Sequence, residues 1–268
     1  MIHPESLALV AGLGAAWLAG CRRAQLPLPR GRAATFLGGL LALTAALNGP
    51  LHDLAERSLV SAHMTQHLVL ILIAAPCLLA GMPAELIDAL LTRRAVRALV
   101  ARATTPVTAL MLYATALVAW HVPGPYALTI ESPLWHIAAH ATMLAVAVIA
   151  WWPVLSPSQR VPALPYAAQI LYLFAFGVPM TVVAAMITGA EVVVYPTAST
   201  TPLEDQRLGG ILMWVPAGIV PLIAFTVVFF RWCAADAAEG SSSRACSCRV
   251  CASMGRAPSR RWQPTAAR

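Results

Sequence analysis

The sequence contains no lysine and few charged residues of any kind. Charged residues make up 11% of the 268 residues and hydrophobic residues 59%, whereas soluble domains contain about 25% and about 45–50%, respectively. This composition excludes an ordinary soluble protein and indicates a membrane protein. The formal net charge of +7 comes from arginine, and its distribution, described below, is typical of membrane topology rather than of nucleic-acid binding.

The motifs of several enzyme classes are also absent. The chain contains no H-E-x-x-H zinc-protease motif, no G-x-S-x-G nucleophile elbow and no Walker A loop. It also lacks the C-x-x-C-H motif that attaches haem covalently. We therefore nominate no catalytic residue and expect a protein that is not an enzyme, in which any haem would be bound through histidine.

Seven hydrophobic stretches predict the architecture. A helix needs about 20 mostly apolar residues to cross the hydrocarbon core of a membrane, and proline, glycine or charged residues bound each stretch. We expect an all-α membrane protein, a polytopic bundle of about seven transmembrane helices in one domain, residues 1–234. The expected spans are residues 6–21, 33–49, 60–81, 105–121, 134–152, 166–188 and 208–232.

Arginine predicts the orientation of this bundle. Sixteen of the 18 arginines lie in the connections after the first, third and fifth stretches, at the very end of the seventh stretch or beyond it. The opposite side has only Arg57 and Arg207. Because basic residues concentrate in cytoplasmic loops, we expect the N-terminus outside and the C-terminus in the cytoplasm.

The last segment, residues 235–268, differs in composition from the rest of the chain. It is rich in serine, alanine, arginine and proline and has no hydrophobic periodicity, so we expect a disordered cytoplasmic tail whose arginines contact membrane lipid. Cys246, Cys248 and Cys251 form the run CSCRVC. This triplet is either a transient site for a soft metal ion or a set of reduced thiols without a role.

Histidine has the most informative distribution, because all seven histidines lie at or near the predicted outer face. His67 lies four positions after His63, and His140 lies four positions after His136, so the two members of each pair lie on the same face of a helix. Imidazole binds copper, zinc, iron and nickel and ligates haem. The two pairs therefore predict a metal or haem site between two helices. The other histidines are His3, His52 and His121.

Histidines near the ends of spans also have a simpler interpretation, in which they lie at the membrane interface or hydrogen-bond a neighbouring helix. This interpretation suits lone residues such as His3 and His52 better than it suits the pairs. Candidate hydrogen-bond partners for the second ring nitrogens are Tyr126, Glu131, Asp205 and backbone carbonyls.

Methionine near the pairs favours copper as the metal. Met64 adjoins His63, Met143 lies three residues after His140, and Met213 lies in the outer half of the last stretch. A thioether beside imidazole favours Cu(I). Methionine is also a common filler of apolar cores, so these residues support the choice of copper without deciding it.

Three segments carry a resemblance to a known family: HMTQHLVLILIAAPCLLAGMP (63–83), WHVPGPYALTIESPLWHIAAHATMLAVAVIAWWPVL (120–155) and LEDQRLGGILMWVPAG (203–218). Together they resemble the CtaG type of cytochrome c oxidase assembly factor, a bacterial family that serves the caa-type oxidase, over about residues 35–230. Matched position by position, the resemblance implies a set of functional polar residues in this chain: His63, Gln66, His67, His121, His136, His140, Asp205, Gln206, Met213 and Trp214.

The resemblance implies a multi-pass protein of the bacterial plasma membrane that helps to assemble a haem–copper oxidase, with oxidase subunits as partners. Combined with the histidine pattern, it leads us to expect a copper ion held by outer-face histidines and passed to an oxidase subunit. The expected metal site consists of His63 and His67, with His136 and His140 opposite them and His121 at the rim. Two alternatives stay open, a haem-binding membrane redox protein and a scaffold whose histidines only join helices. A homo-oligomer is also left open.

The arginine distribution makes a direct prediction about topology. Reporter fusions after residues 57 and 200 should behave as external, and fusions after residues 95 and 240 as cytoplasmic, because arginine-rich connections stay inside. Paired alkaline phosphatase and fluorescent-protein reporters measure the two locations. An external C-terminus would contradict both the orientation and the placement of the histidines at the outer face.

Overall fold

The computed structural model describes residues 4–27 and 29–254, and every regular element among them is a helix. The elements are α1 (Pro4–Arg23), α2 (Arg30–Leu47), α3 (Pro50–Glu56), α4 (Val60–Val69), the π-helical turn η1 (Leu70–Ala74), α5 (Ala75–Ala80), α6 (Ala84–Leu90), α7 (Arg94–Ala103), α8 (Pro106–His121), α9 (Pro123–Glu131), α10 (Pro133–Leu155), α11 (Tyr166–Gly189) and α12 (Pro202–Met254).

Each of the seven predicted stretches is helical, which confirms the all-α prediction. Among the described residues, five helical segments are long and apolar enough to cross a membrane, and a sixth results if the bent pair α7 and α8 is one span. The bend between α7 and α8 is 70°. The predicted number of seven spans and the orientation of the termini stay predictions. The five segments are Arg30–Glu56, Val60–Ala80, Pro133–Leu155, Tyr166–Gly189 and Pro202–Ala238.

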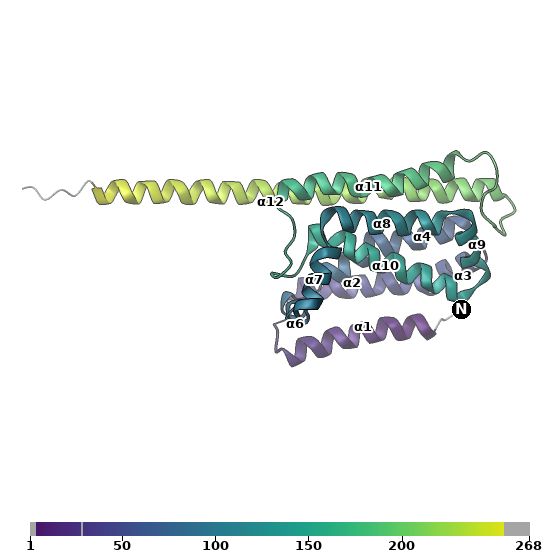
Figure 1. Ribbon diagram of the computed structural model, residues 1–268, viewed down its shortest axis with the longest axis horizontal. Coiled ribbons are helices and arrows are strands. Elements are labelled where there is room, and N and C mark those ends of the chain that lie inside the picture. The colour runs from purple at the N-terminus through teal and green to yellow at the C-terminus, as the bar shows by residue number, and fades with distance from the viewer. Residues whose placement is uncertain (1–3, 28, 255–268) are drawn as a thin grey trace, which may run out of the picture. The chain divides into compact units, whose positions relative to one another are not determined.

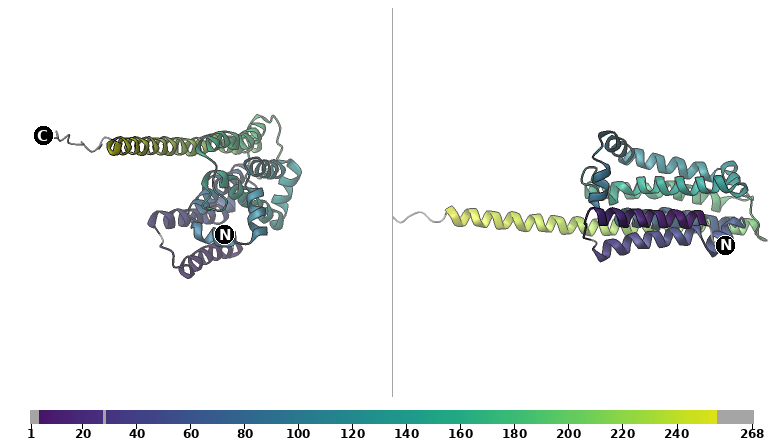
Figure 2. Two further views of the ribbon diagram at one scale, coloured as in Figure 1. Left: turned by 60° about the vertical axis from the view of Figure 1, so that its left-hand side comes forward. Right: turned by 90° about the horizontal axis from the view of Figure 1, so that it is seen from below.

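The chain forms two compact units, Met1–Phe225 and Thr226–Arg268. Within the first, α10 packs against α5, α8, α9 and η1, while α2 packs against α5 and η1. Figure 1 shows α2, α4, α8 and α10 as neighbouring helices with roughly parallel axes, in which α4 and α10 run opposite to α2 and α8, and Figure 2 gives two further views of these helices. This arrangement brings the starts of α4 and α10 and the end of α8 to one end of the bundle.

The C-terminal part of α12 differs from the expected tail. We predicted disorder from residue 235, whereas the backbone of α12 is helical to Met254. Residues 235–254 contain no proline, and extending an existing helix avoids the cost of nucleating a new one. The side chains of Cys246, Cys248 and Cys251 lie outside the described residues, as do His3 and residues 255–268.

A wide helical turn separates the two halves of the third predicted span. The π-helical turn η1 ends two residues before Pro76, where the proline ring would clash with the carbonyl four residues earlier in a regular helix. The carbonyl of Ile71 in this turn accepts a hydrogen bond of 2.8 Å from Trp151 Nε1 on α10. This contact ties the segment after His67 to the helix that carries the second histidine pair.

Two glycines let α2 approach α5 closely. A Cβ atom at Gly39 would lie 2.8 Å from the backbone nitrogen of Leu78, and one at Gly81 would lie 2.5 Å from the backbone nitrogen of Phe36. Real side chains do not tolerate such contacts with backbone atoms. Small residues therefore determine the spacing of these helices, as is common where helices pack in membranes.

Gly39→Ala should lower the midpoint of thermal unfolding in detergent, because the added methyl group must displace the backbone of α5 at a cost of about 1–3 kcal/mol. Gly38→Ala is the matched control, since a Cβ atom there has no neighbour within 4 Å and alanine is the better helix former. Circular dichroism or a thiol-reactive dye measures both midpoints. Equal midpoints for the two variants would contradict the close approach.

Candidate metal centre

Six histidines form one buried cluster at this end of the bundle. We call these six residues the histidine cluster, and each of them has less than 9% of its surface exposed. The two predicted pairs face each other, because the ring centroid of His63 lies 5.4 Å from those of both His136 and His140. The cluster consists of His52 from α3, His63 and His67 from α4, His121 from α8, and His136 and His140 from α10.

Three members of the cluster have ring nitrogens that converge. One nitrogen each from His63, His67 and His140 lies within 4.8 Å of the other two, and we call these residues the three-histidine group. Both nitrogens of His63 and the Nε2 atoms of His67 and His140 are buried without a hydrogen-bond partner. An unsatisfied buried polar atom is costly, so this donor set fits a bound metal ion.

His121 adjoins the group and determines which nitrogen of His67 is free. His121 Nδ1 lies 2.7 Å from the carbonyl oxygen of Leu117, which can only accept a hydrogen bond. In a neutral imidazole Nε2 is then an acceptor, and it lies 3.3 Å from His67 Nδ1, which donates. The lone pair of His67 consequently lies on Nε2, the atom without a partner. His121 is therefore placed to orient a ligand.

His52 and His136 extend the cluster beyond the group. The ring centroid of His136 lies 4.3 Å from that of His140 and 5.4 Å from that of His52. His52 Nε2 lies 3.3 Å from Glu56 Oε1. From the sequence we expect His52 to be a lone residue at the membrane interface, whereas the structure places it in the cluster; its i, i+4 spacing from Glu56 is the sequence signal of this pair.

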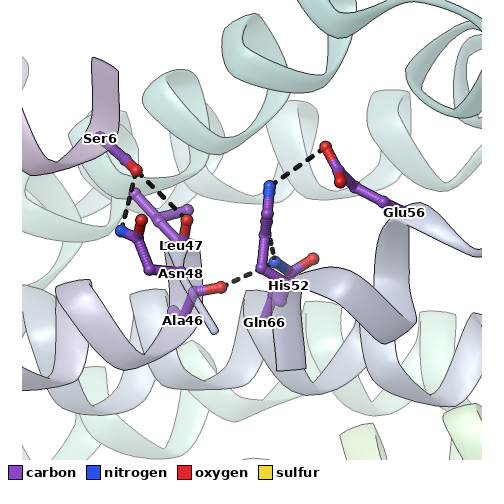
Figure 3. A network of polar contacts seen from close by, with 7 residues as sticks. All are labelled: Ser6, Ala46, Leu47, Asn48, His52, Glu56 and Gln66. Atoms are coloured by element: carbon purple, nitrogen blue, oxygen red, sulfur yellow. Dashed lines mark hydrogen bonds and ion pairs between the residues drawn. The ribbon is translucent and has the colours of Figure 1, made fainter. Parts of the chain in front are cut away.

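Gln66 connects three helices behind this pair. Its Nε2 atom donates to the carbonyl oxygen of Ala46 at 2.7 Å and to His52 Nδ1 at 2.9 Å. Since Nδ1 accepts, the ring proton of His52 lies on Nε2 and points to Glu56. Figure 3 shows this chain of contacts beside a second one, in which Asn48 and the Leu47 carbonyl bind Ser6 of α1.

A tyrosine pair covers the cluster from the side of α9. The ring of Tyr126 lies 5.1 Å from that of His63 and 4.4 Å from that of Tyr195, whose hydroxyl donates to the carbonyl oxygen of His121 at 2.6 Å. Burial raises the pKa of the Tyr126 phenol and raises that of Tyr195 to about 12. Both side chains therefore stay neutral and keep the site apolar.

Comparison with known proteins identifies the family. A family model described as cytochrome c oxidase caa3 assembly factor matches residues 14–235, which is most of the chain. The chain belongs to this family. No curated protein and no solved structure matched the sequence. Membership confirms the resemblance drawn from the paired histidines and associates the chain with assembly of a cytochrome c oxidase.

Two polar residues of this assembly-factor chain, Asp205 and Gln206, accept hydrogen bonds from backbone and hydroxyl groups instead of from histidine rings. Asp205 was expected as a partner for ring nitrogens, but its carboxylate accepts from the Val60 backbone nitrogen at 2.8 Å, from the Ser61 hydroxyl and from the Thr197 hydroxyl at 2.9 Å. It thus caps α4 from α12. Gln206 Oε1 accepts from the backbone nitrogens of Val194 and Tyr195 and holds the loop that presents Tyr195.

The remaining predicted residues have simpler surroundings. Met64, Met143 and Met213 are fully buried, and Met64 Cγ lies next to Gly209 of α12. Glu131 is exposed, so it does not serve as a partner within the cluster. Trp214 has 45% of its surface exposed.

Asp205→Asn should destabilise the start of α4, because the amide NH₂ group cannot accept from the backbone N–H groups that the carboxylate binds. Losing charge-assisted hydrogen bonds of this kind costs about 1–3 kcal/mol, which a lower unfolding midpoint in detergent would report. Glu204→Gln is the matched control, since its neighbouring carboxylate is exposed. If both variants unfold at the parent's midpoint, Asp205 does not hold α4.

Proposed function

We propose that this protein is a non-enzymatic assembly factor that binds a copper ion through His63, His67 and His140 and helps to deliver it to a subunit of a haem–copper cytochrome c oxidase. The observation that carries the proposal is the convergence of three buried imidazoles with unpartnered nitrogens. Membership of the caa3 assembly-factor family supplies the process that such an ion would serve.

The surroundings of the three-histidine group favour a univalent ion. All three ligands are neutral, and no carboxylate belongs to the group. A divalent ion would therefore keep its full double charge in an apolar environment, where the desolvation cost rises steeply with charge. Cu(I) carries a single charge and accepts imidazole and thioether ligands.

Haem fits this arrangement less well than a single ion. Haem iron would take two histidine ligands, whereas three imidazole nitrogens converge here within 4.8 Å of one another, which is the donor set that a single metal ion would use. The haem alternative is therefore an outcome of the test below rather than a second proposal.

Copper at this end of the bundle fits the proposed topology. We propose seven spans, adding α1 and α8 to the five helical segments named above, in the bacterial plasma membrane with the N-terminus outside. The histidine cluster then lies near the outer face, toward which the copper centres of oxidases also lie. A factor that holds its ion there needs no transfer across the membrane.

Replacing any one of His63, His67 and His140 with alanine should cause a similar loss of bound copper. Replacing two of them should lower the bound copper scarcely further, because the effects of substitutions at ligands of one centre are not additive. His121→Leu should weaken the affinity by about 10- to 100-fold, as is typical when a residue that orients a ligand is lost. Elemental analysis and an absorption spectrum of the same purified sample measure metal and haem together, and oxidase activity at limiting copper measures delivery.

Two results would contradict the proposal. A stably inserted triple variant of the three-histidine group that retains copper and supports full oxidase activity would exclude the site. If the purified parent protein shows a haem absorption band and contains no copper, copper delivery is excluded and the haem-binding redox protein is favoured.

A further inference from the structure

A cavity of about 620 Å³ lies next to the histidine cluster. It lies between α1, α2, α3, η1, α9 and α10, and most of its wall is aliphatic. Its polar lining includes Glu56, His52, His136 and His140. His140 thus belongs both to the three-histidine group and to the wall of the cavity, and its Nε2 atom is buried without a partner.

An ion in the three-histidine group needs a way in and out, because the ligands are inaccessible from outside. His63 and His67 are 1% exposed and His140 is 4% exposed. Glu56, in contrast, has 41% of its side chain exposed. The cavity is therefore lined both by a carboxylate that solvent reaches and by an imidazole of the buried group.

The polar residues of the wall follow one another in short steps. Glu56 contacts His52, the ring centroid of His52 lies 5.4 Å from that of His136, and His136 lies 4.3 Å from His140. Metal–nitrogen bonds are about 2 Å long, so side-chain rotation lets an ion bound to His136 reach His140 before it leaves His136. Coordination by these side chains replaces the water molecules that an ion loses when it enters an aliphatic cavity.

The geometry points to this cavity as the passage through which copper is loaded into and released from the three-histidine group, with the Glu56 carboxylate as its receiving ligand. This inference rests on the proposed function. The ion is received at Glu56, crosses the cavity past the ring of His52 to His136 and then passes to His140, and no bond other than these coordination bonds forms or breaks.

His52 and Gln66 position the receiving carboxylate. Gln66 donates to His52 Nδ1 and thereby keeps the ring proton on Nε2, which donates to Glu56. Gln66 is itself anchored on the carbonyl oxygen of Ala46. His52 is thus a positioning residue in the passage and not one of the ligands, and Figure 3 shows the complete chain from Ala46 to Glu56.

Two variants test the passage with the full chain in detergent or nanodiscs. Ile137→Trp puts a large side chain into the wall of the cavity and should slow loading about tenfold or more, while the copper content at saturation stays that of the parent. Leu134→Trp is the matched control, because Leu134 is 72% exposed on the same helix and does not line the cavity. The probe is Cu(I) held by a chromophoric chelator, and the measured quantity is the rate at which the chelator loses its colour.

The second variant is Glu56→Gln, which should slow loading about tenfold at low copper, because charge attraction of a cation to its receiving site raises association rates by 10-fold or more. Glu131→Gln is the control with the same change of charge on an exposed acid outside the cavity wall. It should load at the parent's rate.

The outcomes separate the passage from the proposed function. A parent protein that binds no Cu(I) would overturn the proposed function itself. A parent protein that binds Cu(I), with Ile137→Trp and Glu56→Gln loading at its rate, would overturn the passage alone. The passage would also be overturned if a lipid co-purified in the cavity and the rate of Cu(I) loading were the same with and without that lipid.

Discussion

Six imidazoles are buried together in an apolar helical bundle, and their polar atoms must find partners there. The fold supplies partners for some of them from distant parts of the chain. The Leu117 carbonyl binds His121, which orients His67, and the Ala46 carbonyl anchors Gln66, which orients His52. Both chains end at groups suited to a cation, the free Nε2 of His67 and the Glu56 carboxylate.

The rest of the structure serves to hold α4 where this arrangement requires it. Asp205 of α12 binds the first backbone nitrogens of α4, and Trp151 of α10 binds the π-helical turn that follows it. Gly39 lets the continuation of that helix pack tightly on α2. A change at any of these points would move His63 and His67 without touching either ring.

The proposed delivery of an ion requires both binding and release. The three-histidine group is deeply buried, which suits retention, whereas the half-exposed Glu56 and the cavity beside it suit exchange. In the proposed passage, the short distance between His136 and His140 lets the ion keep a ligand on its last step into the group. Membership of the caa3 assembly-factor family associates the chain with assembly of a cytochrome c oxidase, the process that the proposed transfer would serve.

Hydrophobic stretches and i, i+4 histidine pairs are local patterns, and for this reason the helices, the family resemblance and the facing of His63 and His67 toward His136 and His140 could be predicted from the sequence. Contacts between distant segments have no local pattern. It is the packing of distant segments that makes Asp205 cap α4 instead of contacting a histidine, places His121 to orient His67 and brings His52 into the cluster. Helix packing determines which residues become hydrogen-bond partners in a bundle. It brings His67 to within 3.3 Å of His121, 54 positions along the chain, and the Val60 backbone nitrogen to within 2.8 Å of Asp205, 145 positions along the chain.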